Sequence, residues 1–445
     1  MTEAGRRGTR AVGPLLVLLM VLGGVRAAEP AADALPQPLT LQHALSLADA
    51  PHPRMQQAQA EMDRARSRLD AARAETGVDV SLRGRVRWVE PSELAPDDQH
   101  DDHKAAVVVR KRLYDFGLSE AREAAAREGV QGQRWQYQET RAQRRIRIME
   151  RFFDVLLADL EYARDNEAMA VAYVDLDRLR NRHELGQVSD LELLEKESEY
   201  QTIRRQRAAS QARQRATRSR LALALNRPGG LPAELAPPEL PQLERELPPH
   251  RTLVEKALED NPDLQNLRAR VAAAGESVEA ARAGDRPRVD AVMEGAAYSR
   301  ELGSRDEWRA GVEFEVPLYN GGRTSSAVAE AKAERYRLQA ELAEAEHEVR
   351  QAVLDLWLEL DTLRTRRDEV RALRDYRELY LDRSRTIYEQ EVKTDLGDSM
   401  VRLTEAQLAE ARTDYRAALA WERMDALTGG PPQAAVSEEQ SGDDT

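Results

Sequence analysis

The sequence predicts a mainly α-helical protein with four short β-strands, built as two copies of one structural unit. Three observations carry this prediction. Sequence motifs recur in the two halves, two long stretches without proline carry apolar residues every seven positions, and four short segments alternate between apolar and polar residues. Heptad spacing predicts long helices that pack as antiparallel coiled coils, and alternation predicts strands with two unlike faces.

The repeat consists of short motifs that occur in the same order in both halves. PRMQ at 53–56 and AARA at 71–74 return as PDLQ at 262–265 and AARA at 280–283. YDFG at 114–117 returns as YNGG at 319–322, and SDL at 189–191 returns as TDL at 394–396. An internal duplication of this length predicts that each half forms the same unit, in the order helix, strand, strand, long helix, helix.

The long helices are predicted at residues 118–185 and 323–391. Apolar residues recur every seven positions at Ile146, Phe153 and Leu160 in the first helix. The seam of the second helix is more regular: its members are Leu342, Val349, Leu356, Leu363 and Val370. Two shorter helices in each half would stack end to end alongside the long helix. The predicted pairs are 53–75 with 190–226 and 262–284 with 398–427.

The N-terminus predicts a secretory signal peptide over residues 1–27. A basic start is followed by the apolar stretch 12–25 and a small residue, Ala27, and an uncleaved anchor is the alternative interpretation. The remaining chain divides into a leader (28–38), a first repeat (39–226), a Pro-rich linker (227–249), a second repeat (250–428) and a disordered tail (429–445). No other run approaches eighteen apolar residues, so we expect any membrane span to consist of strands.

Composition excludes several classes of function. The net charge of -13, without a distinct basic domain, argues against nucleic acid as a partner. The absence of cysteine excludes disulfides, thiolate metal sites and cysteine nucleophiles. Charged residues make up 33% and aromatic residues 5% of the chain, which is typical of long helices that pack through narrow seams rather than of a large globular core.

The four strands are predicted at residues 78–88, 104–113, 289–299 and 308–318. Their length and alternation suit strands that cross a membrane with one apolar and one polar face. The predicted lipid-facing residues are Val80, Leu82, Trp88, Trp308, Val312 and Phe314. The predicted residues of a water-filled lumen are Arg83, Arg85, Arg87, Glu313 and Glu315.

Four strands cannot close a barrel by themselves, and open strand edges are not tolerated in lipid. Several identical chains must therefore contribute if the strands span a membrane. Two chains would give eight strands, whose interior fills with side chains, and three would give twelve, which leaves room for a lumen. The alternative is a soluble four-stranded sheet with one hydrated face.

The order, duplication and spacing of these features resemble the TolC family of outer-membrane efflux and secretion channels, over residues 39–427. The resemblance implies a homotrimer whose chains share a twelve-stranded barrel in the outer membrane, above a periplasmic α-helical coiled-coil tunnel with a gated tip. It also implies a passive exit duct of a tripartite efflux or type I secretion system. The implied partners are a periplasmic adaptor, an inner-membrane pump of the RND or ABC type and outer-membrane lipid.

In this family the tip is closed by bonds around the two helical turns. The resemblance implies a periplasmic gate at Tyr388, Lys393, Glu192 and Asp190, and a ring of acids at Asp395 and Asp398. Each could instead be a solvated helix end or a packing residue. The chain departs from the family pattern at two positions: Glu391 replaces the glycine seen at Gly186, and Gly397 stands where an acid is expected.

No catalytic site, cofactor or metal is predicted. The segment DDQHDDH at 97–103 has the composition of a metal site, but a flexible acidic loop is the preferred interpretation. No nucleophile–base set and no nucleotide-binding motif is present, so the chain is not expected to be an enzyme. The alternative to the channel is a soluble periplasmic coiled-coil scaffold or adaptor that does not conduct.

Overall fold

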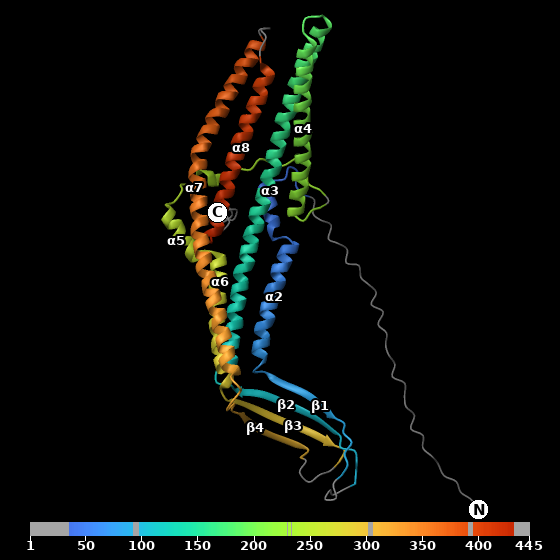
Figure 1. Ribbon diagram of the computed structural model, residues 1–445, viewed down its shortest axis with the longest axis vertical. Helices are drawn as coiled ribbons and strands as arrows, with labels where there is room; N and C mark the ends of the chain where they lie inside the picture. Colours follow the sequence, from blue (N-terminus) through green and yellow to red (C-terminus); the bar gives the residue numbers. More distant parts are fainter. Residues whose placement is uncertain are drawn as a thin grey trace, which may run out of the picture.

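The structure is a computed structural model that describes residues 35–91, 98–228, 230–232, 234–300, 306–389 and 395–430. The predicted signal peptide, most of the predicted leader and residues 431–445 of the predicted tail lie outside the described residues, as does Lys393. The described chain is elongated: a sheet lies at one end, a helical body forms the middle, and the α3–α4 and α7–α8 pairs reach the opposite end (Figure 1).

The two halves contain the same order of longer elements. The first half comprises α1 (Leu41–Ser46), η1 (Leu47–Asp49), α2 (Pro53–Ala74), β1 (Val78–Arg85), β2 (Lys104–Tyr114), α3 (Leu118–Glu184) and α4 (Asp190–Ala224). After η2 (Pro241–Glu244), the second half comprises α5 (His250–Asp260), α6 (Pro262–Arg282), η3 (Ala283–Asp285), β3 (Arg288–Tyr298), β4 (Trp308–Glu315), α7 (Arg323–Glu389) and α8 (Leu396–Leu427). The structure is therefore mostly helical with a small antiparallel sheet, as predicted.

Local sequence explains where the main helices begin. Helices α2 and α6 both have proline at their first position, where a missing N–H costs nothing. The side chains of His52 and Asn261 cap them by accepting hydrogen bonds from the backbone N–H groups of Arg54 and Leu264. Gly117 precedes α3 with φ 94°, a conformation that favours glycine.

The long helices form one layer. Helix α3 packs between the α2 and α4 pair on one side and the α6 and α8 pair on the other, and α7 packs on the far side of α6 and α8 (Figure 1). Each pair is stacked end to end, as predicted. The layer therefore has two lateral edges, one formed by α2 and α4 and the other by α7.

The four strands form one antiparallel sheet in the order β1-β2-β3-β4. The central β2–β3 pair joins the two halves of the chain, because β2 precedes α3 and β3 follows α6. Strands β1 and β4 are the edges of this sheet. Since α2 leads into β1 and β4 leads to α7, the open edges of the sheet continue the lateral edges of the helical layer.

The main core lies in the helical body. Ile148, Phe152 and Val155 of α3 are fully buried against α1, the end of α4 and part of α8. A second cluster joins α5, α7 and the end of α8 around Val353 and Trp421. The predicted seam included Phe153, which is 1% exposed, but it missed Phe152 because α3 is covered on a second face by α1 and α4.

Two predicted strands were too long. The first was expected to reach Trp88 but ends at Arg85, and the fourth was expected to reach residue 318 but ends at Glu315. After Arg85 the chain departs from the regular ladder, with a single bridge between Trp88 and Asp101. Pro317 lacks a backbone N–H and cannot donate to a strand ladder, which accounts for the second early end.

Candidate functional site

The sheet carries an apolar face that runs across all four strands. The register aligns Leu82 of β1 with Val107 of β2, then Gly295 of β3 and Trp308 of β4, and residues that pair directly share a face. The same alternation and pairing place on this face Val78, Val80, Val109, Met293, Ala310, Val312 and Phe314, together with the charged residue Lys111, which pairs with Val78. Large side chains here are open to solvent in the single chain: Leu82 is 79% exposed and Phe314 is 73% exposed.

The opposite face of the sheet is charged and crossed by ion pairs. Glu294 of β3 lies between Lys104 of β2 and Arg309 of β4, with 2.5 Å between Arg309 Nη2 and Glu294 Oε2. Arg110 of β2 lies 3.8 Å from Asp290 and 3.5 Å from Glu313. These side chains surround small apolar residues, so that Ala106 and Val108 are only 2% and 3% exposed.

The predicted lumen and lipid-facing residues fall on separate faces wherever they lie in strands. Arg83, Arg85, Glu313 and Glu315 are on the charged face, and Val80, Leu82, Trp308, Val312 and Phe314 are on the apolar face. Arg87 and Trp88 lie beyond β1. Arg87 pairs with Asp102, and Trp88 stacks on His100 with 4.9 Å between ring centroids.

The first helical turn of the tip is held by its own side chains. Gly186 ends α3 with φ 71°, and the backbone N–H of Gln187 donates to the carbonyl of Arg182 at 2.9 Å. Ser189 and Glu192 form a capping box at the start of α4. Asp190 Oδ1 lies 2.6 Å from His183 Nε2. The two acids predicted for the gate, Asp190 and Glu192, therefore both bond to residues of the same turn.

At the start of α8, Asp395 is bonded by Tyr380 rather than by the predicted Tyr388. The hydroxyl of Tyr380, not predicted from the sequence, donates to Asp395 Oδ2 at 2.8 Å, and this bond raises the pKa of Tyr380. Asp398 Oδ2 lies 3.3 Å from Arg402 Nε. Tyr388 is 61% exposed, and among the described residues neither Asp190 nor Glu192 bonds to it.

Gly397 explains one departure from the family pattern. A Cβ atom at this position would lie 2.7 Å from Val171 Cγ2 of α3, closer than real Cβ contacts occur. Thr404, further along α8, donates to Glu167 of α3 at 2.8 Å. Helix α8 therefore packs so closely on α3 near the tip that an acid at position 397 has no room.

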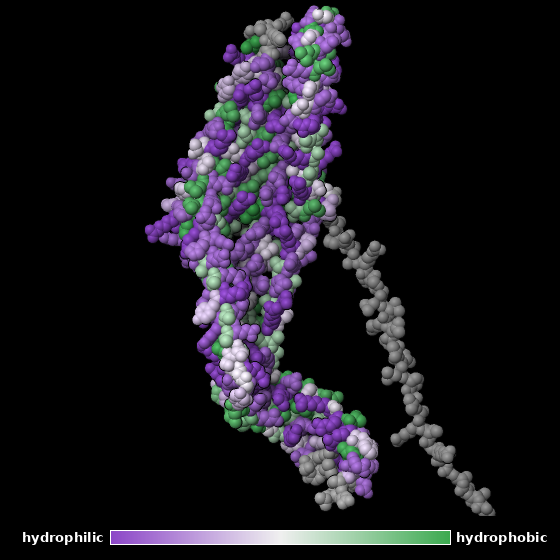
Figure 2. Space-filling model, in the orientation of Figure 1, coloured by the Kyte–Doolittle hydropathy of each residue, from purple (hydrophilic) through white to green (hydrophobic). Residues whose placement is uncertain are grey.

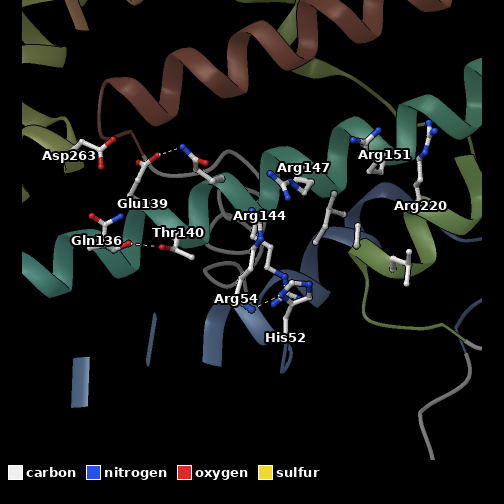
Figure 3. A pocket seen from close by; sticks show the side chains of 14 residues that line it. His52, Arg54, Gln136, Glu139, Thr140, Arg144, Arg147, Arg151, Arg220 and Asp263 are labelled. Atoms are coloured by element: carbon white, nitrogen blue, oxygen red, sulfur yellow. Dashed lines mark hydrogen bonds between the residues drawn. The ribbon is translucent and has the colours of Figure 1, made fainter. Parts of the chain in front are cut away.

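The helical body contains a pocket of about 580 Å³ lined by arginine side chains (Figure 3). His52 and Arg54 come from the start of α2, Arg220 comes from the end of α4, and Arg144, Arg147 and Arg151 come from α3. The sequence did not predict this pocket. Figure 2 shows that the visible face of the helical body is mostly hydrophilic, with hydrophobic residues among the helices.

The described residues contain neither a cluster suited to a metal ion nor a helix suited to span a membrane. No group of three or more His, Cys, Asp or Glu side chains in the described part of the chain is placed to hold a metal ion. Within the same ranges, no helix combines the length and the apolar character needed to cross a membrane.

Comparison with known proteins identifies the family. Residues 253–430 match the family described as outer membrane efflux protein. The chain carries an outer membrane efflux protein domain. This match agrees with the family resemblance predicted from the sequence, and it covers the second half of the chain. No curated protein sequence matches the chain.

Solved structures of outer-membrane channels share the fold of this chain. The outer membrane protein VceC from Vibrio cholerae has a TM-score of 0.68 at 17% identity, covering 88% of this chain and 96% of that one. The CmeC outer membrane channel of Campylobacter jejuni has a TM-score of 0.71 at 16% identity, covering 89% and 86%. The MtrE outer membrane channel of Neisseria gonorrhoeae, solved in an open state, has a TM-score of 0.68 at 16% identity, covering 88% and 89%.

Proposed function

We propose that this chain is one subunit of an outer-membrane channel-tunnel, the passive exit duct of a tripartite efflux or type I secretion system. The observation that carries the proposal is the sheet, which has an exposed apolar face, a charged face and two unpaired edges in a single chain. The outer membrane efflux protein match and the shared channel fold support the same assignment. The protein resides in the outer membrane, with most of the chain in the periplasm.

The two open edges support a closed ring of identical chains. In a head-to-tail ring, β4 of one chain pairs with β1 of the next, and α7 packs against α2 and α4 of the next. One repeated contact then removes every exposed strand edge. Three copies give a twelve-stranded barrel with a lumen, whereas two give eight strands without one. The repeated motifs and element order favour an origin by internal duplication.

In this ring the apolar face meets lipid and the charged face lines the water-filled lumen. Val80, Leu82, Trp308, Val312 and Phe314 contact outer-membrane lipid, and Arg83, Arg85, Glu313 and Glu315 face water. Arg87 and Trp88, just beyond β1, line the outer mouth. A charged face of this kind is costly in lipid but well solvated in a lumen.

The tip forms the gate. Tyr388 and Lys393 of the second turn oppose Asp190 and Glu192 of a first turn, and Asp395 with Asp398 forms an acidic ring that favours cations. A periplasmic adaptor docks here, and an inner-membrane RND or ABC pump supplies the energy. Each exposed bond contributes about 0–1 kcal/mol, so closure depends on the symmetric copies acting together.

Membrane fractionation of the full-length protein tests the proposal. We expect the chain to stay with outer membranes through a carbonate wash and to run on a gel as a heat-sensitive oligomer. A periplasmic scaffold would wash off as a soluble protein, and that outcome would refute the channel. In planar bilayers, replacing Tyr388 and Lys393 together should raise single-channel conductance; unchanged conductance removes both residues from the gate but leaves the channel intact.

A further inference from the structure

The arginine-lined pocket lies where two stacked helices meet the side of a third. Helix α4 ends and α2 begins at this junction, and the middle of α3 passes alongside it (Figure 3). The residues that line the pocket are therefore far apart in sequence, at 52–54, 136–151 and 220–224, with Asp263 of α6 at the margin.

The pocket has an unbalanced charge. Its lining holds five arginines (Arg54, Arg144, Arg147, Arg151 and Arg220) against two acids, Glu139 and Asp263. Burial, and next the nearby Asp263, raise the pKa of Glu139. A neighbouring pocket on α3 and α8 holds three arginines and three acids. In a chain of net charge -13, so local an excess of cations requires an explanation.

Most of these cations lack a counter-charge within the chain. Among the described residues, Arg54, Arg147 and Arg220 have no carboxylate oxygen within 4.0 Å, whereas Arg151 pairs with Asp154 at 2.8 Å. Arg144 is 5% exposed and donates to the carbonyls of Leu47 and Ala50, at 2.9 and 2.7 Å. Its Nε is buried and has no hydrogen-bond partner.

The start of α2 adds to the positive potential. His52, which caps this helix, and Arg54 of its first turn both line the pocket, so the positive end of the α2 dipole lies beside it. The neighbouring arginines contribute, after burial, to lowering the pKa of His52. Like charges that line one pocket raise its positive potential, which favours a bound anion.

We propose that this pocket binds a compact multivalent anion of the phosphate class, one per chain, which bridges α2, α3 and α4. Guanidinium groups match phosphate oxygens with two parallel hydrogen bonds, and several from different helices fix the position of one anion. The volume of about 580 Å³ admits a group larger than a single phosphate. The site is lined by residues of one chain, and in the proposed ring it lies on the edge against which α7 of the next chain packs.

Calorimetric titration of the purified full-length protein in detergent with inorganic pyrophosphate, at constant ionic strength, tests the proposal. We expect saturable binding with one site per chain. The variant R54Q/R147Q/R220Q should bind at least about tenfold more weakly, because it removes three of the five guanidinium groups that line the pocket. The control R68Q/R134Q/R215Q removes one exposed arginine from each of the same helices, and its affinity should stay within about twofold.

Three outcomes would overturn the site. These are the absence of saturable heat with the wild type, equal weakening in the control, and binding of a short-chain phosphatidic acid in place of pyrophosphate. The last result would assign the pocket to a lipid headgroup rather than to a free anion. Circular dichroism checks that the triple variant folds, and the single variant Arg147→Gln, expected to weaken binding several-fold, replaces it if it does not.

Discussion

The helical body and the sheet place their large apolar side chains in opposite environments. In the body, Phe152 and Phe153 are 0% and 1% exposed. On the sheet, Leu82 and Trp308 are 79% and 71% exposed, although each strand pairs with its neighbours in the sheet. The body therefore completes its own core within one chain, whereas the apolar face of the sheet is left uncovered by the single chain.

The charged side chains show the same contrast. In the body, the ion pair of Arg141 with Asp49 lies at the periphery, while Arg144 and Arg367 are buried and donate to backbone carbonyls. On the sheet, Glu294 with Lys104 and Arg309 extends over three strands beside Val108. Apart from Lys111, the charged side chains of the four strands share one face of the sheet, as the proposed lumen requires.

Removing the largest core side chain of α3 should produce the largest effect. Phe152→Ala leaves a cavity in the fully packed body and is expected to lower the free energy of unfolding by about 3–5 kcal/mol. Chemical denaturation followed by helical circular dichroism measures this loss. Tyr336→Ala, at a position that is 70% exposed on α7, is the matched control and should change stability by less than about 0.5 kcal/mol. Equal effects of both changes would mean that the body does not have an independent core.

A charge on the apolar face of the sheet should give the next largest effect. Leu82→Arg is expected to cost about 2–4 kcal/mol of membrane insertion if the face meets lipid, and to deplete the heat-sensitive oligomer in outer membranes. The matched control is Leu82→Met, which keeps the same position apolar and should leave the oligomer unchanged. A normal oligomer in the Leu82→Arg variant would show that this face is solvated, and the sheet would then not differ from the body in needing an apolar environment.

Sequence periodicity predicted the elements that have one apolar face and one polar face. The alternation in 78–85 and 308–315 was enough to separate Leu82 and Trp308 from Arg83 and Glu313, because a strand has only two faces. It did not locate the strand ends at Arg85 and Glu315, where alternation continues after the ladder has stopped.

Contacts between distant segments could not be predicted in the same way. Phe152 lies outside the heptad seam, and its burial depends on α1 and the end of α4. Tyr380 of α7 donates to Asp395, fifteen positions further along the chain, just before α8. Tyr376 lies one turn before Tyr380, with 6.2 Å between the ring centroids, but this spacing does not indicate the bond to Asp395. The arginine pocket gathers three segments, none of which is unusual by itself in a chain rich in arginine.

The smallest expected effect tests whether charge contributes to the stability of the body at all. Arg141 donates two hydrogen bonds to Asp49, at 2.6 and 2.7 Å, and joins η1 to α3 at an exposed position. The hydrogen bond from Arg141 holds the pKa of Asp49 below its ordinary 3.8. Because the folded-state pKa is the lower one, the pair stabilises the fold above pH 3.8 and loses this contribution as the pH falls through the folded-state pKa.

Since both side chains are largely solvated, Asp49→Asn should lower the free energy of unfolding at neutral pH by only about 0–1 kcal/mol. Denaturation of the wild type and the variant between neutral pH and pH 3 measures the difference, which should shrink as the pH falls. A loss at neutral pH as large as that expected for Phe152→Ala would mean that the small helices are held on the body by charge rather than by packing. Helices α1 and η1 would then be stabilised mainly by ion pairs, as the charged face of the sheet is, rather than by burial in the adjacent core.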